Sequence, residues 1–351
     1  MTINVGILGF AHGHVNNYCR EWKQNPAHDI RLVAGWDHDT ARLAQAVESY
    51  GVHACTTPDE LLSRADVQAV VIATETSLHA SLAEKSAAAG KTVAVQKPIA
   101  LTVPEADRVV AAVERYGVPF TIAWQMRVDP QNLKMKDVIQ SGILGRVFMV
   151  RRRHALSTQL PGIPAWHFVA EYNRDIWADD ACHPIDFIQW LLGVPESVMA
   201  ELVTLHNPQK PMDNGIALYR YADGTLAEVS CSFTCLAAEN TTEIIAEKGT
   251  IIQSYGDGPS SSAPRPAGIP GLKWYTLGKR DWTYSDIASP TSQGVRLSGL
   301  SGPLAEFFHG RRPPIATAEE GRTSLRMTLA TYVSTREGRR VRLDDPAIAL
   351  V

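Results

Sequence analysis

Two polar segments that lie far apart in the sequence carry residue types suited to proton and hydride chemistry. Lys97 directly follows the apolar segment 91–96, and Asp179 and His183 stand four residues apart, with Asp186 three residues further on. On a helix these three side chains would share one face, where a carboxylate can orient an imidazole one turn away. Oxidation of an alcohol removes a hydride from carbon and a proton from oxygen, so a base is required, and a lysine or an imidazole can serve.

We therefore predict Lys97, Asp179 and His183 as a catalytic set, without deciding which of Lys97 and His183 is the base. Each residue also has a simpler explanation. Most lysines after a strand are exposed, aspartates often cap a helix N-terminus, and a lone histidine is usually structural.

A turn of small residues follows the first apolar strand and could hold a dinucleotide. Backbone amides at the start of a helix bind a pyrophosphate, and glycines let it approach closely. The pattern G-x-G-x-x-G is only partly present, because Ala11 and His14 occupy two of its glycine positions and Gly13 stands one place early. We predict that this turn contacts a cofactor, and the alternative is a plain strand–helix turn without a ligand. The predicted contacts are Gly9, Phe10, Ala11, His12, Gly13 and His14.

Asp37 ends the second apolar strand, where an acidic residue can accept hydrogen bonds from an adenosine ribose. No arginine follows Asp37 immediately, so a 2′-phosphate would meet a negative charge. We therefore expect NAD as the cofactor, with NADP as the alternative. A loop carboxylate without a ligand is the simpler explanation of Asp37.

The first third of the chain alternates strands and helices, which predicts a doubly wound parallel sheet of the α/β class over residues 1–125. Because ligands of such sheets bind beyond the carboxyl ends of the strands, Lys97 should point into the site, and Pro98 restricts its backbone. The predicted strands are Ile3–Leu8, Ile30–Trp36, Val67–Ala73, Lys91–Gln96 and Pro119–Trp124, and the predicted helices are Thr40–Tyr50, Ser77–Ala89 and one from a Thr102–Glu105 capping box to Gly117.

Residues 126–351 predict a second α/β domain with a mainly antiparallel sheet, because strand-like runs follow one another with short turns. The expected strands are Arg146–His154, Ser197–Leu205, Ile216–Tyr221, Leu226–Phe233 and Thr242–Glu247, and the expected helices are Pro130–Ser141, Asp179–Leu192 and 318–337. Residues 254–303 are rich in Gly, Pro and Ser and predict a long loop.

Composition excludes several classes of protein. The 351 residues carry a net charge of −3, so no field attracts nucleic acid or an anionic membrane. No apolar run could span a bilayer, and the N-terminus does not resemble a secretory signal. Five cysteines at irregular spacing favour reduced thiols, and Cys231 and Cys235 alternate as on a strand, so no metal is expected. These features predict a cytoplasmic protein with a small-molecule partner.

Several motifs together resemble the glucose–fructose oxidoreductase / inositol dehydrogenase family, called Gfo/Idh/MocA. The resemblance covers nearly the whole chain. Gln96-Lys97-Pro98 is similar to the family's Glu-Lys-Pro, and Asp179, His183 and Asp186 are similar to its Asp-x-x-x-His-x-x-Asp. The segment 73–79, which includes Thr74, Glu75 and His79, resembles the family's Ala-Thr-Pro-Asn-x-x-His, and the segments 125–127 and 142–145 resemble its entry into the second domain.

The resemblance implies an N-terminal Rossmann domain that binds NAD(P) and a C-terminal domain with an open sheet for substrate binding and oligomerisation. It implies a homodimer or homotetramer formed through that sheet. It also implies that Lys97, Asp179 and His183 act on a sugar, cyclitol or related polyol. Thr74, Glu75, His79, Gln96 and Lys97 join the nucleotide contacts.

Departures from the family pattern affect both sides of the site. Gln96 replaces a glutamate and Glu75 replaces a proline, and the bulkier segment 175–178 replaces a glycine-rich approach to the catalytic helix. Loss of the carboxylate at position 96 would ease deprotonation of Lys97 if the two side chains are close. Residues that could line the substrate side, with aromatic faces for a sugar ring and polar groups for its hydroxyls, are Arg127, His154, Trp166, His167 and Tyr172.

Two other functions remain open at this point. The pair His12 and His14 after the first strand resembles a metal-binding His-x-His, so a metal-dependent hydrolase is conceivable. A non-catalytic regulator of the same fold is the second alternative, because the glycine turn and Gln96 are altered.

Overall fold

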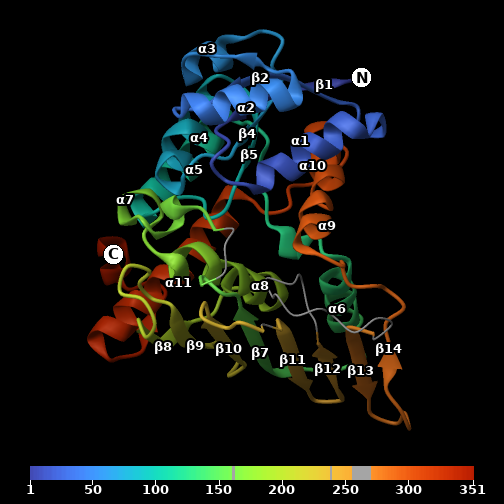
Figure 1. Ribbon diagram of the computed structural model, residues 1–351. Helices are drawn as coiled ribbons and strands as arrows, with labels where there is room; N and C mark the ends of the chain where they lie inside the picture. Colours follow the sequence, from blue (N-terminus) through green and yellow to red (C-terminus); the bar gives the residue numbers. More distant parts are fainter. Residues whose placement is uncertain (160–162, 238, 255–269) are drawn as a thin grey trace. The chain divides into compact units, whose positions relative to one another are not determined.

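The computed structural model describes residues 1–159, 163–237, 239–254 and 270–351, which form two compact units (Figure 1). Unit 1 comprises Met1–Gln125, Ala170–Asn173 and Leu297–Leu325; unit 2 comprises Met126–Val169, Arg174–Arg296 and Arg326–Val351. Two late segments therefore pack with the N-terminal part of the chain. None of the helices in these described ranges combines the length and the apolar character needed to cross a membrane.

Unit 1 is built on a six-stranded sheet in the order β3-β2-β1-β4-β5-β6, and every neighbouring pair is parallel. Its central strands are buried on both faces, as expected when helices cover both sides. The strands are β1 Ile3–Leu8, β2 Ile30–Trp36, β3 His53–Ala54, β4 Ala69–Ile72, β5 Thr92–Val95 and β6 Phe120–Ile122. The helices are α1 His14–Gln24, α2 Thr40–Tyr50, α3 Pro58–Ser63, α4 His79–Ala88, α5 Val103–Tyr116, α7 Ala170–Asn173 and α10 Ser301–Phe308.

Local signals in the sequence explain where these helices begin and end. The Asp39 side chain caps α2 by accepting the backbone N–H groups of Ala41 and Arg42 at 2.9 and 3.1 Å. The predicted capping box opens α5, because the Thr102 and Glu105 side chains each accept a backbone N–H of the other residue. The predicted parallel sheet and its α/β class are confirmed.

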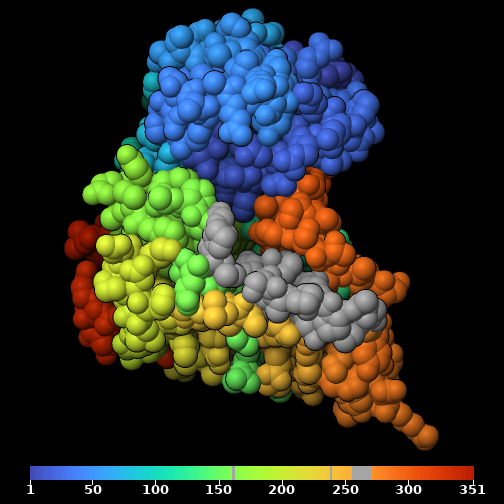
Figure 2. Space-filling model, in the orientation of Figure 1, coloured from blue at the N-terminus to red at the C-terminus, as the bar shows by residue number. Residues whose placement is uncertain are grey.

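Unit 2 contains a nine-stranded mixed sheet in the order β14-β13-β12-β11-β7-β10-β9-β8-β15, in which only the pair β7/β10 is parallel within the described part of the chain. Figure 2 shows the green surface of β7 between the yellow and gold surfaces of strands that follow much later in the sequence. The strands are β7 Val147–Ala155, β8 Ser197–Val203, β9 Asn214–Arg220, β10 Leu226–Ser232, β11 Thr241–Ala246, β12 Gly249–Gln253, β13 Leu272–Thr276, β14 Thr283–Tyr284 and β15 Val341–Arg342.

Helices cover one face of this second sheet. They are α6 Pro130–Gln140, α8 Cys182–Leu192 and the last part of α11 Ala318–Glu337 (Figure 1). The residues of α9 Gln293–Ser298 are divided between the two units, with Arg296 in unit 2 and Leu297 in unit 1. The backbone N–H groups of Ala200 and Leu202 in β8 donate to the Ser334 and Thr335 hydroxyls of α11. The uncovered face presents alternate side chains of each strand, which gives the buried–exposed alternation of β9 and β10.

The structure corrects two predictions for this part of the chain. The loop predicted over residues 254–303 contains β13, β14, α9 and the start of α10; the part of it from 255 to 269 lies outside the described residues. Strand pairing with β12 makes an extended segment out of a Gly- and Pro-rich region. The helix predicted from Asp179 to Leu192 is α-helical only from Cys182, because Trp177–Ala181 forms a π-helical turn.

Candidate active site

The turn after β1 begins at Gly9, in a backbone conformation that favours glycine. Gly9 has a φ of +87°, and a Cβ atom there would lie 2.3 Å from Cγ2 of Thr74. The Gly9 and His12 backbone N–H groups donate to Trp36 and Ala73 carbonyls, so the turn is fixed against the ends of β2 and β4. Gly13, by contrast, faces open space within the described residues.

Polar atoms at the carboxyl ends of β4 and β5 are buried without a hydrogen bond among the described residues. They are Oγ1 of Thr74 and Oε1 of Gln96, whose amide Nε2 donates to the Tyr18 hydroxyl at 2.7 Å. A buried acceptor that finds no partner costs free energy unless a ligand or water supplies a donor. Together with the close approach at Gly9, these atoms fit a polar ligand such as a dinucleotide.

Asp37 is covered by its neighbours. Its carboxylate accepts the backbone N–H groups of Phe10 at 2.7 Å and Asp39 at 2.8 Å, and it pairs with the Arg42 guanidinium at 2.9 Å. The Asp37 side chain is fully buried. The expected ribose contact of Asp37 therefore requires Arg42 to share this carboxylate or to move, and Arg42 is a residue that the sequence interpretation missed. It lies five residues after Asp37, where the first turn of α2 brings it back.

Glu75 holds the other side of the same network. Oε1 of Glu75 accepts from Arg42 at 2.8 Å, and Oε2 lies 2.8 Å from Nε2 of His38. Burial alone would raise the pKa of Glu75, but the hydrogen bonds from His38 and Arg42 outweigh it, so the pKa lies below its ordinary value. Glu75, which stands where the family has proline, thus joins the loop after β4 to the end of β2.

His79 connects the loop after β4 to the segment that carries Lys97. Its Nδ1 lies 2.7 Å from the carbonyl oxygen of Pro98 and its Nε2 lies 3.2 Å from that of Thr74. Complete burial lowers the pKa of His79 to about 4, so the ring is neutral at physiological pH. Lys97 is only 2% exposed and precedes a cis peptide bond to Pro98. A buried lysine at the carboxyl edge of a parallel sheet is an unusual position, because lysines are mostly exposed.

The polar helix of unit 2 begins with the π-helical turn, and this turn changes the pairing that the sequence predicts. Asp179 Oδ2 lies 2.8 Å from Nδ1 of His167, which stacks on Trp166 at a ring-centroid distance of 3.8 Å. Asp180, not singled out from the sequence, lies 2.7 Å from Nε2 of His154 and 3.8 Å from Nε2 of His183. The described residues of unit 2 thus bring three imidazoles beside two carboxylates.

The third member of the polar row has a different partner. Asp186 forms a bidentate, fully buried ion pair with Arg127, with both N–O distances at 2.8 Å. Two parallel bonds of this kind fix the planes of both groups. Arg127, predicted to face the substrate, therefore anchors α8 to the segment before α6. Tyr172 lies in unit 1 and is about half exposed.

The His12 and His14 rings meet edge to face with centroids 4.3 Å apart. Neither belongs to a cluster of three metal-ligating side chains among the residues that the structure describes. This geometry gives no support to the metal-dependent hydrolase alternative.

Two family profiles match the chain, one in its N-terminal part and one in its C-terminal part. The profile described as "Oxidoreductase family, NAD-binding Rossmann fold" matches residues 3–123, and the profile of the GFO/IDH/MocA C-terminal domain matches residues 132–252. The chain belongs to the GFO/IDH/MocA family. The family resemblance inferred from the motifs and the NAD-binding character of the first domain are confirmed.

Individual relatives agree with this placement. The chain is 32% identical to inositol 2-dehydrogenase 2 of Saccharopolyspora erythraea, over 60% of this chain and 58% of that protein, so the match spans less than two thirds of the relative. It is 26% identical to D-apiose dehydrogenase of Paraburkholderia graminis, over 93% of this chain and 86% of that protein. The WlbA dehydrogenase of Bordetella pertussis, solved with NADH and UDP-GlcNAcA, has the same fold, with a TM-score of 0.79, 23% identity and 97% coverage of both chains.

Proposed function

We propose that this protein is an NAD-dependent dehydrogenase that transfers a hydride between the nicotinamide and a hydroxyl carbon of a sugar, cyclitol or related polyol. The observation that carries the proposal is Lys97, a buried amine at the same carboxyl edge of the parallel sheet as the Gly9 turn and Asp37. Ligands of parallel sheets bind at that edge. The substrates named for the two enzyme relatives, an inositol and apiose, are polyhydroxylated, which supports the substrate class.

The residues proposed to hold NAD are those of the turn and of the strand ends around it. The turn Gly9–His14, with Phe10, Ala11, His12 and Gly13, would cradle the pyrophosphate at the start of α1, and Asp37 and Glu75 would face the ribose side through Arg42 and His38. The buried oxygens of Thr74 and Gln96 would accept hydrogen bonds from the bound ligand. His79 fixes the backbone at Pro98. The bound nicotinamide would supply the hydride acceptor or donor.

The proton chemistry is assigned to Lys97 and His183. In the oxidising direction, one of them takes the proton from the substrate oxygen as the carbon loses its hydride, and in the reducing direction the same group returns the proton. Asp180 lies beside His183, and Asp179 orients the His167 ring through Nδ1. His154, Trp166, His167 and Tyr172 are proposed to bind the substrate, with Trp166 offering an apolar face to a sugar ring.

Turnover and nucleotide binding can be tested separately. A panel of sugars, inositols and sugar acids, followed by NADH absorbance with the full chain, should identify a substrate. Lys97→Ala should then lower kcat by about 10²–10⁴-fold, while the Kd for NAD measured by calorimetry stays close to the parent value. Lys85→Ala is the matched control, because Lys85 on α4 is exposed and pairs only with Asp59 among the described side chains. Near-normal turnover of Lys97→Ala would remove Lys97 from the mechanism.

We also propose that the uncovered face of the nine-stranded sheet forms a homodimer or homotetramer, and that the protein works in the cytoplasm. That face exposes apolar side chains on several strands, among them Met199, Ile216 and Ile245. An exposed apolar patch across a sheet is typical of a protein–protein interface. Ile216→Glu should shift the mass measured by light scattering towards the monomer. An unchanged mass would refute the interface.

A further inference from the structure

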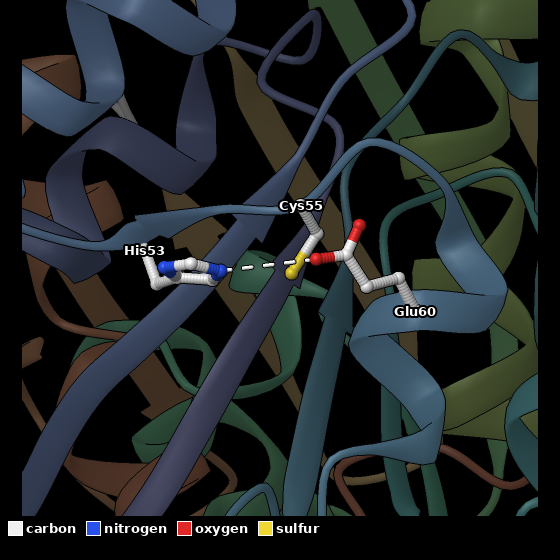
Figure 3. A group of neighbouring side chains, drawn as sticks. All are labelled: His53, Cys55 and Glu60. Atoms are coloured by element: carbon white, nitrogen blue, oxygen red, sulfur yellow. Dashed lines mark ion pairs between the residues drawn. The ribbon is translucent and has the colours of Figure 1, made fainter.

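A second group of chemistry-bearing side chains lies in unit 1, at the edge strand of the parallel sheet. It consists of His53 and Cys55, at the end of β3, and Glu60 on α3 (Figure 3). None of the three takes part in the proposed dehydrogenase reaction. The ligand atoms of all three lie within 4.8 Å of one another, and Figure 3 shows the thiol, the imidazole and the carboxylate converging on one point.

The distances suit a small tetrahedral cation. Zinc binds sulfur at about 2.3 Å and nitrogen or oxygen at about 2.0–2.2 Å, so neighbouring ligand atoms of a tetrahedral site lie about 3.4 Å apart. Nε2 of His53 and Oε1 of Glu60 are already 3.8 Å apart. The Cys55 sulfur lies within 4.8 Å of both atoms, so rotation of the side chains would close the three ligands around one cation.

The backbone directs two of the ligands to the same side. His53 and Cys55 are separated by one residue on an extended segment, and alternate side chains of a strand point to the same face. β3 is paired with β2, and the Cys55 backbone N–H donates to the Gly35 carbonyl at 2.8 Å, which extends that pairing to the cysteine. These ligands thus belong to the sheet and not to a free loop.

Neighbouring hydrogen bonds fix the third ligand. Oε2 of Glu60 accepts from the backbone N–H and the hydroxyl of Thr56, at 2.6 and 2.7 Å, and the Thr57 side chain caps α3 by accepting the Glu60 backbone N–H at 3.0 Å. The other carboxylate oxygen, Oε1, faces the imidazole and the thiol. Hydrogen bonds of this kind to a ligating carboxylate orient it and raise metal affinity.

The buried sulfur of Cys55 distinguishes this group from an ordinary ion pair on the surface. Cys55 is 1% exposed, whereas the side chains of His53 and Glu60 are 56% and 40% exposed. An exposed histidine–glutamate pair alone contributes little to stability. Here the pair stands over a buried sulfur, which is the ligand that selects zinc-like metals over magnesium or calcium.

We propose that His53, Cys55 and Glu60 form a binding site for one divalent cation of the zinc class, with water in the fourth position. The cation would join the end of the edge strand β3 to α3, and so has a structural role independent of the dehydrogenase proposal. Zinc binds cysteine sulfur, histidine nitrogen and glutamate oxygen, and a site with three protein ligands holds water in the fourth position.

Cobalt(II) is the probe, because a thiolate bound to it gives a charge-transfer band that water or carboxylate ligands do not give. Titration of the full-length protein should produce this band with a stoichiometry of one, and zinc should abolish it by competition. Cys55→Ser should remove the band. His53→Ala and Glu60→Gln should weaken cobalt binding by more than about tenfold, as expected for loss of a ligand when loss of a supporting partner already costs that much.

Two matched variants separate this site from other histidines and thiols. Cys235→Ser removes the one cysteine that is not fully buried, and His206→Ala removes an exposed histidine of unit 2; both should bind cobalt as the parent does. Circular dichroism checks that each variant is folded. Absence of a sulfur band in the parent, or a band that survives Cys55→Ser in folded protein, would overturn the proposal. An NAD titration of the same samples reports on the nucleotide site independently.

Discussion

Replacement of Glu75 by glutamine is expected to shift the cofactor preference of this protein towards NADP. In the parent, Glu75 binds Arg42 at 2.8 Å and His38 at 2.8 Å, while Arg42 also pairs with Asp37 at 2.9 Å. One arginine therefore stands between two carboxylates, and its charge is more than compensated. A 2′-phosphate near Asp37 would have no uncompensated cation to meet.

The magnitude follows from the bonds that change. Glu75→Gln removes one negative charge and turns two charge-assisted hydrogen bonds into bonds to a neutral amide. A hydrogen bond to a charged group contributes about 1.5–3 kcal/mol, against about 0.5–1.5 kcal/mol for a neutral one. Because the side chains of Arg42 and His38 are 25% and 44% exposed, solvent screening reduces the gain available to a phosphate to about 1–2 kcal/mol. The ratio of Kd for NAD to Kd for NADP should rise by about 5–30-fold.

Calorimetric titration of the full-length protein with each nucleotide measures this ratio without reference to turnover. Glu48→Gln is the matched control, because Glu48 lies on the same helix as Arg42 and is exposed. In the double variant Glu75→Gln/Arg42→Met the gain for NADP should disappear. A ratio that changes by less than about twofold, or a gain that persists without Arg42, would refute the account of this network.

Three further outcomes are expected. Burial raises the pKa of Asp175 to about 6, above its value in the unfolded chain, so ionisation destabilises the fold as pH rises from about 4 through 6. Asp175→Asn should therefore gain about 3 kcal/mol in urea unfolding at pH 7.5 and less than about 1 kcal/mol near pH 4. Equal effects at the two pH values would contradict this. Arg127→Met removes one member of a buried ion pair and should cost about 3–5 kcal/mol. The added change Asp186→Leu should restore most of this loss in the same assay. Gly9→Ala should weaken NAD binding by more than about tenfold, because Gly9 has a positive φ and a Cβ atom there would clash with the Thr74 backbone. Gly13→Ala should bind NAD as the parent does. Similar Kd values for the two variants would disprove the role of the turn.

Local patterns predicted most of the Rossmann half of the chain, but not the short edge strand β3 or the helix α3. The bounds of β1, β2 and α2 coincide with the predicted ranges, because an apolar strand of a parallel sheet and a capped amphipathic helix are both encoded by near neighbours in sequence. The region 270–303 was mispredicted for the opposite reason. Leu272–Thr276 becomes a strand because β12 offers it a partner, and a single segment contains no information about its partner.

The site divides in the same way. The sequence by itself determined the residue types at Gly9, Asp37 and Lys97 and their positions at strand ends, since these depend on spacing along the chain. Only the tertiary structure decided which charges face each other. Arg42 and Glu75 are 33 residues apart yet share a hydrogen bond, and a π-helical turn sets Asp180 beside His183 where an ideal helix would set Asp179. Such pairings arise from the packing of separate elements and from one extra residue in a turn, and neither is recorded in the periodicity of any one element.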